Sequence, residues 1–274
     1  MQANTVFLCL LLIFITVVSY LFIWPKVLRR WILSKPFPES WLAILKNRLP
    51  IYKNLSTDQQ LELQNHIKLF VHNKQFIGCA GLDVTDEIKV TIASQASLLL
   101  LNRPTHEYAK LQFIYIYPTS FRATQKVRDE LGLVSTQTRD LLGESWDSGK
   151  VVLAWDNVEQ GVRNFTDGYN VVLHEFAHQL DQESGSANGA PLLYTKAAYK
   201  SWAYVFGKEF EALKNSDPTK ASLIDRYGAT NAAEFFAVAT ETFFEEPHKL
   251  YQNHHALFEE LSRYYHLDPR EWVN

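Results

Sequence analysis

The first strong pattern in the chain is an apolar run at its N-terminus. Residues 6–24 include no charged side chain and are rich in Leu, Ile, Phe and Val. Because a helix rises 1.5 Å per residue, a run of this length roughly matches the ~30 Å hydrocarbon core of a bilayer. The pattern predicts one transmembrane helix, and we assign residues 1–33 to an N-terminal anchor and its basic flank.

The residues on either side of this run favour an anchor over a cleaved signal peptide. A signal peptide has a basic segment before a shorter apolar stretch and a small-residue cleavage site after it. No Lys or Arg precedes the run, which ends at Trp24 and is followed by Pro25-Lys26 and not by a small-residue site. Four basic side chains lie on its C-terminal side, namely Lys26, Arg29, Arg30 and Lys35. Since basic flanks remain in the cytoplasm, we expect a single-pass protein of the inner membrane whose catalytic domain faces the cytoplasm. A signal peptide is the alternative and leaves that orientation open.

The pattern after the anchor predicts a linker followed by one mainly helical domain. Residues 34–40 contain two prolines and are typical of a linker, so the domain covers residues 41–274. Ser56-Thr-Asp-Gln59 forms a capping box that predicts a helix to about Asn73. A second helix is expected from Thr85 or Asp86 to Leu101. Later helical patterns cover about residues 195–215, 231–245 and 254–265.

Two short segments have the aromatic and β-branched content of strands. They are Phe113–Tyr117 and Val151–Trp155, and we expect them to pair in a small sheet beside the helix near residue 175. An edge strand next to a cleft can bind a peptide as an added strand, and Val151–Trp155 is the candidate for that edge. The predicted fold class is therefore α+β, mainly helical, with a small β-sheet and one N-terminal transmembrane helix.

The chemistry of the chain is concentrated in the apolar segment 168–181. It contains His174-Glu175-Phe176-Ala177-His178, and histidines four residues apart lie on one face of a helix, where they can hold one cation. Glu175 is rotated about 100° from His174, so it can accept a proton from water without being a ligand. The alternative is an amphipathic helix with capped or solvated histidines. The apolar neighbours argue against it, because buried His and Glu side chains need partners.

A catalytic zinc ion takes three protein ligands and keeps one open position. The third ligand is expected to be Glu234, in the first turn of a second apolar helix with Asn231 as its N-cap. Favourable charge placement at a helix N-terminus is the alternative explanation for Glu234. Glu241, two turns further along the same face, is a rival ligand or a partner of a ligand, and a solvated acid is equally compatible with its position.

Longer motifs show a resemblance to a known family over about residues 41–269. They are Leu49–Leu55, Gly143–Trp146, Val151–Trp155, Gly168–Asp181, Tyr227–Pro247 and Tyr264–Pro269. With these motifs the chain resembles the Mlc titration factor A family, bacterial zinc-dependent peptidases whose active site is similar to that of anthrax lethal factor. The resemblance implies a zincin-like metallopeptidase domain with one Zn²⁺. It also implies ligands at His174, His178 and Glu234, a general base at Glu175 and a transition-state tyrosine at Tyr227.

Two further residues near the motif are candidates for supporting roles. Tyr227 precedes Glu234 by seven residues, so its phenol could lie over the metal and donate to the oxyanion of the transition state. Asp181 could accept the second ring proton of a histidine ligand. An ordinary loop tyrosine and a helix-terminal acid are the respective alternatives.

Composition excludes some classes of function. The formal net charge of −3 provides no basic field for direct nucleic-acid binding. Only Cys9 and Cys79 are present, and Cys9 lies in the apolar run, so neither a disulfide nor a thiol zinc site is expected.

These observations predict a membrane-anchored zinc metallopeptidase that hydrolyses peptide substrates. The resemblance adds aminopeptidase-like action and regulation of sugar uptake through binding of the transcriptional repressor Mlc. The alternative is a non-catalytic interaction protein that sequesters a transcription factor. A complete set of Glu175, Tyr227 and two histidine ligands is needed for catalysis and superfluous for docking, which favours the enzyme.

Overall fold

The computed structural model of the chain describes residues 2–103, 108–128, 134–141, 143–146 and 149–273. Its backbone divides into two compact units, residues 1–38 and residues 39–274. The smaller unit is almost entirely helical, with α1 (Gln2–Val18), a π-helical turn (Ser19–Ile23) and α2 (Trp24–Ser34). Within the described residues, one helix at Asn4–Ser34 is long and apolar enough to cross a membrane.

The larger unit is mainly helical, as the pattern of apolar residues predicts. Helix α4 begins after Ser56, where the expected capping box is present, and α5 begins after Thr85, whose side chain accepts from the backbone N–H of Ile88 at 3.3 Å. Helix α5 ends at Leu98 rather than Leu101. The α-helices of this unit are α3 (Glu39–Arg48), α4 (Thr57–Asn73), α5 (Asp86–Leu98), α6 (Trp155–Arg163), α7 (Val171–Asp181), α8 (Lys196–Lys214), α9 (Ala232–Glu245), α10 (Pro247–Asn253) and α11 (His255–Tyr265).

A four-stranded sheet lies beside α7, with the strand order β1-β2-β6-β5. Strands β1 (Gln75–Gly78), β2 (Phe113–Tyr117) and β6 (Lys150–Ala154) are parallel, and β5 (Gly143–Trp146) is antiparallel to β6. The predicted pairing of the second and sixth strands is thus present, from Phe113 opposite Lys150 to Tyr117 opposite Ala154.

The prediction that Val151–Trp155 forms an edge strand is wrong. Strand β6 pairs with β2 on one side and with β5 on the other, and Trp155 already begins α6. Val151 and Leu153 are fully buried, as expected for an internal strand. The backbone groups of β6 are therefore engaged on both sides, and the sheet ends instead at β1 and β5.

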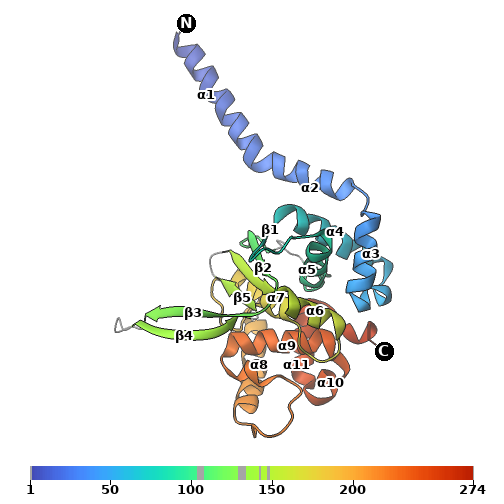
Figure 1. Cartoon of the computed structure of the whole chain (residues 1–274). Helices are drawn as coiled ribbons and strands as arrows, with labels where there is room; N and C mark the ends of the chain where they lie inside the picture. Colours follow the sequence, from blue (N-terminus) through green and yellow to red (C-terminus); the bar gives the residue numbers. More distant parts are fainter. Residues whose placement is uncertain (1, 104–107, 129–133, 142, 147–148, 274) are drawn as a thin grey trace. The chain divides into compact units, whose positions relative to one another are not determined.

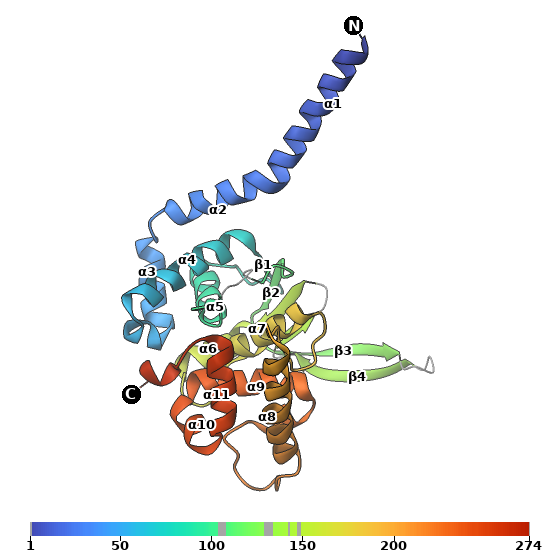
Figure 2. The same cartoon turned by 180° about the vertical axis from the view of Figure 1, so that it is seen from behind.

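A separate two-stranded ribbon was not predicted. Strands β3 (Phe121–Arg128) and β4 (Val134–Leu141) are antiparallel, with Phe121 opposite Leu141 and Arg128 opposite Val134. Figures 1 and 2 show this ribbon projecting from the side of the larger unit.

Helix α7 lies in the core between the sheet and α9 (Figures 1 and 2). Toward α4, Phe176 packs against Phe70 and Tyr108, with ring centroids 5.5 and 4.9 Å apart. Burial of aromatic and aliphatic side chains of this size contributes about 1.5–3 kcal/mol each. The side chains that surround the histidine motif are therefore held rigidly.

Helix α9 is fixed from the opposite side by α8. Phe236 lies 5.7 Å from Trp202 and Phe235 lies 5.8 Å from Phe206, measured between ring centroids in edge-to-face geometry. The two helices that carry the predicted ligands thus each have their own aromatic support.

Candidate metal centre

The two histidines of the motif lie one turn apart on α7, as their spacing predicts. Their ring centroids are 4.8 Å apart, and the two Nε2 atoms approach to 3.2 Å. Both side chains are largely buried, with 11% and 12% of their surfaces exposed. The imidazole nitrogens therefore point to one common position near the surface of the core.

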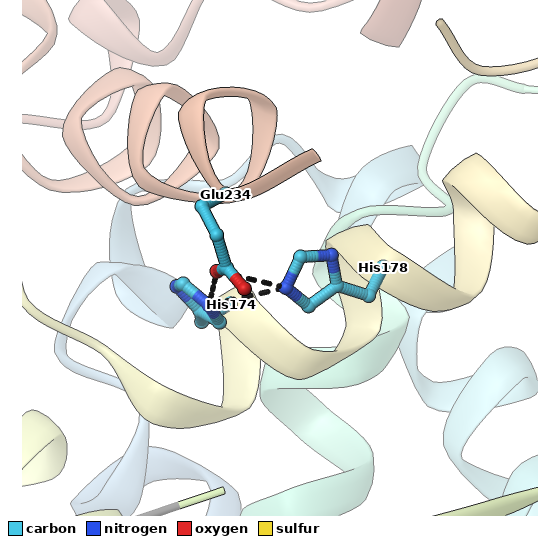
Figure 3. A group of neighbouring side chains, drawn as sticks. All are labelled: His174, His178 and Glu234. Atoms are coloured by element: carbon cyan, nitrogen blue, oxygen red, sulfur yellow. Dashed lines mark hydrogen bonds and ion pairs between the residues drawn. The ribbon is translucent and has the colours of Figure 1, made fainter. Parts of the chain in front are cut away.

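Glu234 reaches the same position from α9. Asn231 caps this helix by accepting from the backbone N–H of Glu234 at 3.0 Å, which fixes the glutamate in the first turn. Its Oε2 atom lies 3.0 Å from Nε2 of His174 and 3.2 Å from Nε2 of His178. Figure 3 shows the carboxylate extending from α9 toward the two rings. One ligand atom from each of the three residues lies within 4.8 Å of the others.

The charges of these groups favour a cation at this position. Burial alone would raise the pKa of Glu234, but hydrogen bonds to His174 and His178 hold that pKa well below its ordinary value. Burial alone would lower the pKa of His174, but the charge of Glu241 and the bond to Glu234 raise it well above the usual range. Carboxylates thus contact both ring nitrogens of His174, Glu241 at Nδ1 and Glu234 at Nε2.

The other ring nitrogen of His174 is held by Glu241. Its Oε1 atom lies 2.7 Å from Nδ1, and the carboxylate is only 2% exposed. A carboxylate on the remote nitrogen of a metal-binding histidine fixes the tautomer and the ring orientation. Of the roles open to Glu241, the structure therefore favours the partner of a ligand.

Of the two alternatives for Asp181, the structure favours the helix-terminal acid over the partner of a histidine. Its carboxylate accepts from the backbone N–H of Gly189 at 2.7 Å and so holds the loop after α7. Asp181 lies three residues after His178, on the turn that directs its side chain toward that loop.

Glu175 and Tyr227 both lie between the ligands in the sequence, Glu175 between the two histidines and Tyr227 between His178 and Glu234. Glu175 belongs to the same turn of α7 as His174 and is 4% exposed. Tyr227 is part of a 3₁₀ turn (Arg226–Ala229) whose start is capped by Asp225, and its ring centroid lies 5.9 Å from that of His174. At 56% exposure, the tyrosine side chain faces the solvent side of the cluster. The structure thus brings His174, His178 and Glu234 together with Tyr227 beside them, and Glu175 follows the first of these residues on α7.

Comparison with known proteins identifies the family. A family model described as glucose-regulated metallo-peptidase M90 matches residues 24–266. The chain belongs to the M90 metallo-peptidase family. Membership confirms the resemblance inferred from the sequence motifs and implies a metal cofactor.

Several relatives of this M90 chain cover most of its length. An uncharacterized protein of Synechocystis sp. is 40% identical over 267 residues, which is 94% of this chain and 96% of the relative. Mlc titration factor A of Klebsiella pneumoniae is 29% identical over 225 residues, or 81% of this chain and 84% of the relative. Mlc titration factor A of Yersinia pestis is 27% identical over 255 residues, or 89% and 93%.

The residues present fit the metal that M90 membership implies. Two imidazoles and one carboxylate are a ligand set of catalytic zinc sites, which leave a further position open. His174, His178 and Glu234 supply this set from two helices that pack directly against each other.

Proposed function

We propose that this chain is a zinc-dependent peptidase with a zincin-like catalytic domain and aminopeptidase activity. The proposal is supported chiefly by the convergence of three ligand atoms within 4.8 Å of one another, from His174, His178 and Glu234. Membership of a metallo-peptidase family supports peptide hydrolysis. Glu175, next to the first ligand, supplies the carboxylate that such a reaction requires.

When bound, zinc supplies a Lewis acid that acidifies a water molecule and polarises the scissile carbonyl. His174, His178 and Glu234 would hold the ion, and Glu241 keeps the His174 ring in the orientation that binding needs. Glu175 accepts the proton of the attacking water and passes it to the departing amine. The phenol of Tyr227, on the exposed side of His174, donates a hydrogen bond to the developing oxyanion.

Metal removal tests this function. We expect full-length protein in detergent to release p-nitroaniline from amino-acid p-nitroanilides, to lose that activity on chelation and to regain it with Zn²⁺. The control substrates are the same p-nitroanilides with an acetylated N-terminus. An aminopeptidase should not cleave them, because it recognises the free amine. Hydrolysis that survives complete chelation would refute the metal mechanism, and equal cleavage of acetylated substrates would refute the aminopeptidase assignment.

A regulatory role is the second candidate function. Relatives carry the name Mlc titration factor A, which supports binding of an Mlc-type transcriptional repressor by this chain. Binding that survives loss of catalysis would establish a role as a sequestering protein beside the enzyme.

We further propose that residues 1–33 anchor the chain in the inner membrane and that residues 34–40 link the anchor to a catalytic domain at 41–274. No acidic residue precedes Glu39, whereas Lys26, Arg29, Arg30 and Lys35 follow the apolar run. Trp24 and Trp31 are both more than half exposed and suit the interface between lipid and water.

The orientation of the anchor gives a direct prediction. The C-terminus should lie in the cytoplasm, because the basic flank stays on the cytoplasmic side. A reporter fused after Asn274 should therefore be active if it works in the cytoplasm and inactive if it needs the periplasm. Alkaline phosphatase and green fluorescent protein fused at this position make a matched pair. Phosphatase activity in the periplasm would overturn the proposed orientation.

A further inference from the structure

Two carboxylates of α9 accept hydrogen bonds from the segment that leads into α7. The backbone N–H groups of Gly168 and Tyr169 donate to Oε2 of Glu245 at 3.0 and 3.2 Å. The backbone N–H of Asn170 donates to Oε2 of Glu241. These three residues lie outside regular secondary structure, so the bonds to α9 determine where α7 begins.

Asn170 connects this segment to the first metal ligand. Its backbone oxygen accepts from the N–H of His174 at 2.9 Å, and its N–H is held by the same Glu241 that binds Nδ1 of His174. Asn170, Glu241 and His174 therefore form a closed ring of hydrogen bonds. Any displacement of Asn170 shifts both the backbone of His174 and the carboxylate that orients its ring.

The Asn170 side chain is itself fixed at both ends. Its Oδ1 atom caps α7 by accepting from the N–H groups of Val172 and Leu173 at 3.1 Å each, which leaves Nδ2 to donate to Oε1 of Glu245 at 3.0 Å. A methyl group on Gly161 of α6 would lie 3.2 Å from this amide, so the glycine allows the close approach.

Glu245 belongs to the same face of α9 as Glu234 and Glu241. It lies 11 and 4 residues after them, close to three turns and to one turn of a helix. Glu234 and Glu241 contact the histidines. Glu245 is only 1% exposed, and its hydrogen bonds within the described part of the chain go to Gly168, Tyr169 and the Asn170 cap. A buried carboxylate is costly unless several donors satisfy it, and three donors are supplied here by one short segment.

We propose that Asn170 and Glu245 are positioning residues for the metal centre, which set the register of α7 against α9 and thereby the placement of His174. The inference rests on the proposed metal-binding function. Neither residue belongs to the candidate ligand cluster of His174, His178 and Glu234, so both act through His174.

The direction of the Asn170–Glu245 hydrogen bond provides a sharp test. Glu245→Gln presents an amide to the Asn170 amide, and Asn170→Asp replaces the amide donor with an acid, so each single variant removes the donation from Asn170 Nδ2 to the side chain at position 245. The double variant reverses it: the introduced aspartate would still cap α7 and accept from the new glutamine, whose oxygen would accept from Gly168 and Tyr169. We expect each single variant to weaken Zn²⁺ binding about 10–100-fold, the range for groups that orient metal ligands, and the double variant to return within about threefold of the parent.

The measurement is Zn²⁺ affinity of the full-length protein by competition with a chromophoric chelator, together with the absorption spectrum of bound Co²⁺ and the melting temperature. Thr195→Ala is the matched control, since it removes the N-cap of α8, where Thr195 accepts from Ala198 at 3.0 Å. It should lower the melting temperature without changing metal affinity.

The possible results separate this inference from the proposed function. Two results would overturn the positioning role while the peptidase proposal stands. One is an unchanged Zn²⁺ affinity in the single variants, and the other is a loss of Zn²⁺ affinity in the double variant equal to the two single losses combined. If a single variant fails to fold, the double variant decides, because recovery of both folding and affinity requires the reversed bond. Absence of metal binding by the parent protein would refute the proposed function and this inference with it.

Discussion

Replacing Glu175 with Gln should lower the turnover number about 10³-fold and leave Zn²⁺ bound. Glutamine preserves the size of the side chain but cannot accept the proton of the attacking water, and general base catalysis contributes roughly 10²–10⁴ in rate. The ligands His174, His178 and Glu234 are unchanged, so metal content should remain at one ion per chain. The measurement pairs kcat for an amino-acid p-nitroanilide with zinc analysis of the same sample.

Two companion variants make this result specific. Glu211→Gln removes an exposed carboxylate on α8 and should leave kcat unchanged. Tyr227→Phe should lower kcat about 10²–10³-fold with little change in KM, because loss of one oxyanion donor acts on the transition state alone. Full activity in Glu175→Gln would show that another group accepts the proton, and full activity in Tyr227→Phe would remove the phenol from the mechanism.

Local signals in the sequence were sufficient for much of the fold. The capping box at Ser56 sets the start of α4, and the alternating aromatic and β-branched residues of 113–117 match β2. Both signals depend on neighbouring residues only. Strand β1 and helix α6 were not predicted, since Gln75–Gly78 is only four residues long and Trp155–Arg163 follows a strand without a turn.

The position of β6 in the sheet illustrates what a local pattern cannot determine. Alternating burial of Val151 and Leu153 identifies a strand, but the pairing partners on its two sides come from other segments of the chain. Strand β5 returns antiparallel from residues 143–146 and covers the side that the sequence left open. The edges of the four-stranded sheet are therefore β1 and β5, and β6 is internal.

Part of the metal centre can likewise be predicted from local sequence, and part depends on contacts between distant segments. The spacing of His174 and His178 follows from the period of one helix. Whether Asp181 or Glu241 is the partner of a histidine depends on how α7 packs against α9. His174 and Glu241 are 67 residues apart in the sequence, so no local pattern could show their contact. Asn170 and Glu245 carry no motif, and their contribution becomes visible only in the contacts between the two helices.

Replacing Glu234 with Gln should lower Zn²⁺ affinity at least about 100-fold and abolish peptidase activity at limiting zinc. Zinc sites bind with about 10–16 kcal/mol spread over their ligands, so the loss of one charged ligand costs about 3 kcal/mol. Glu234 is also the only acid among the three clustered ligands. Its replacement by an amide leaves two neutral imidazoles to bind a divalent cation. Chelator competition gives the affinity, and activity measured against zinc concentration shows whether excess metal restores turnover. Glu246→Gln, one residue beyond α9, is the matched control and should bind Zn²⁺ like the parent. Parent-like affinity in Glu234→Gln would mean that another acid completes the site, and Glu241, already 2.7 Å from His174, would then be the residue to replace next.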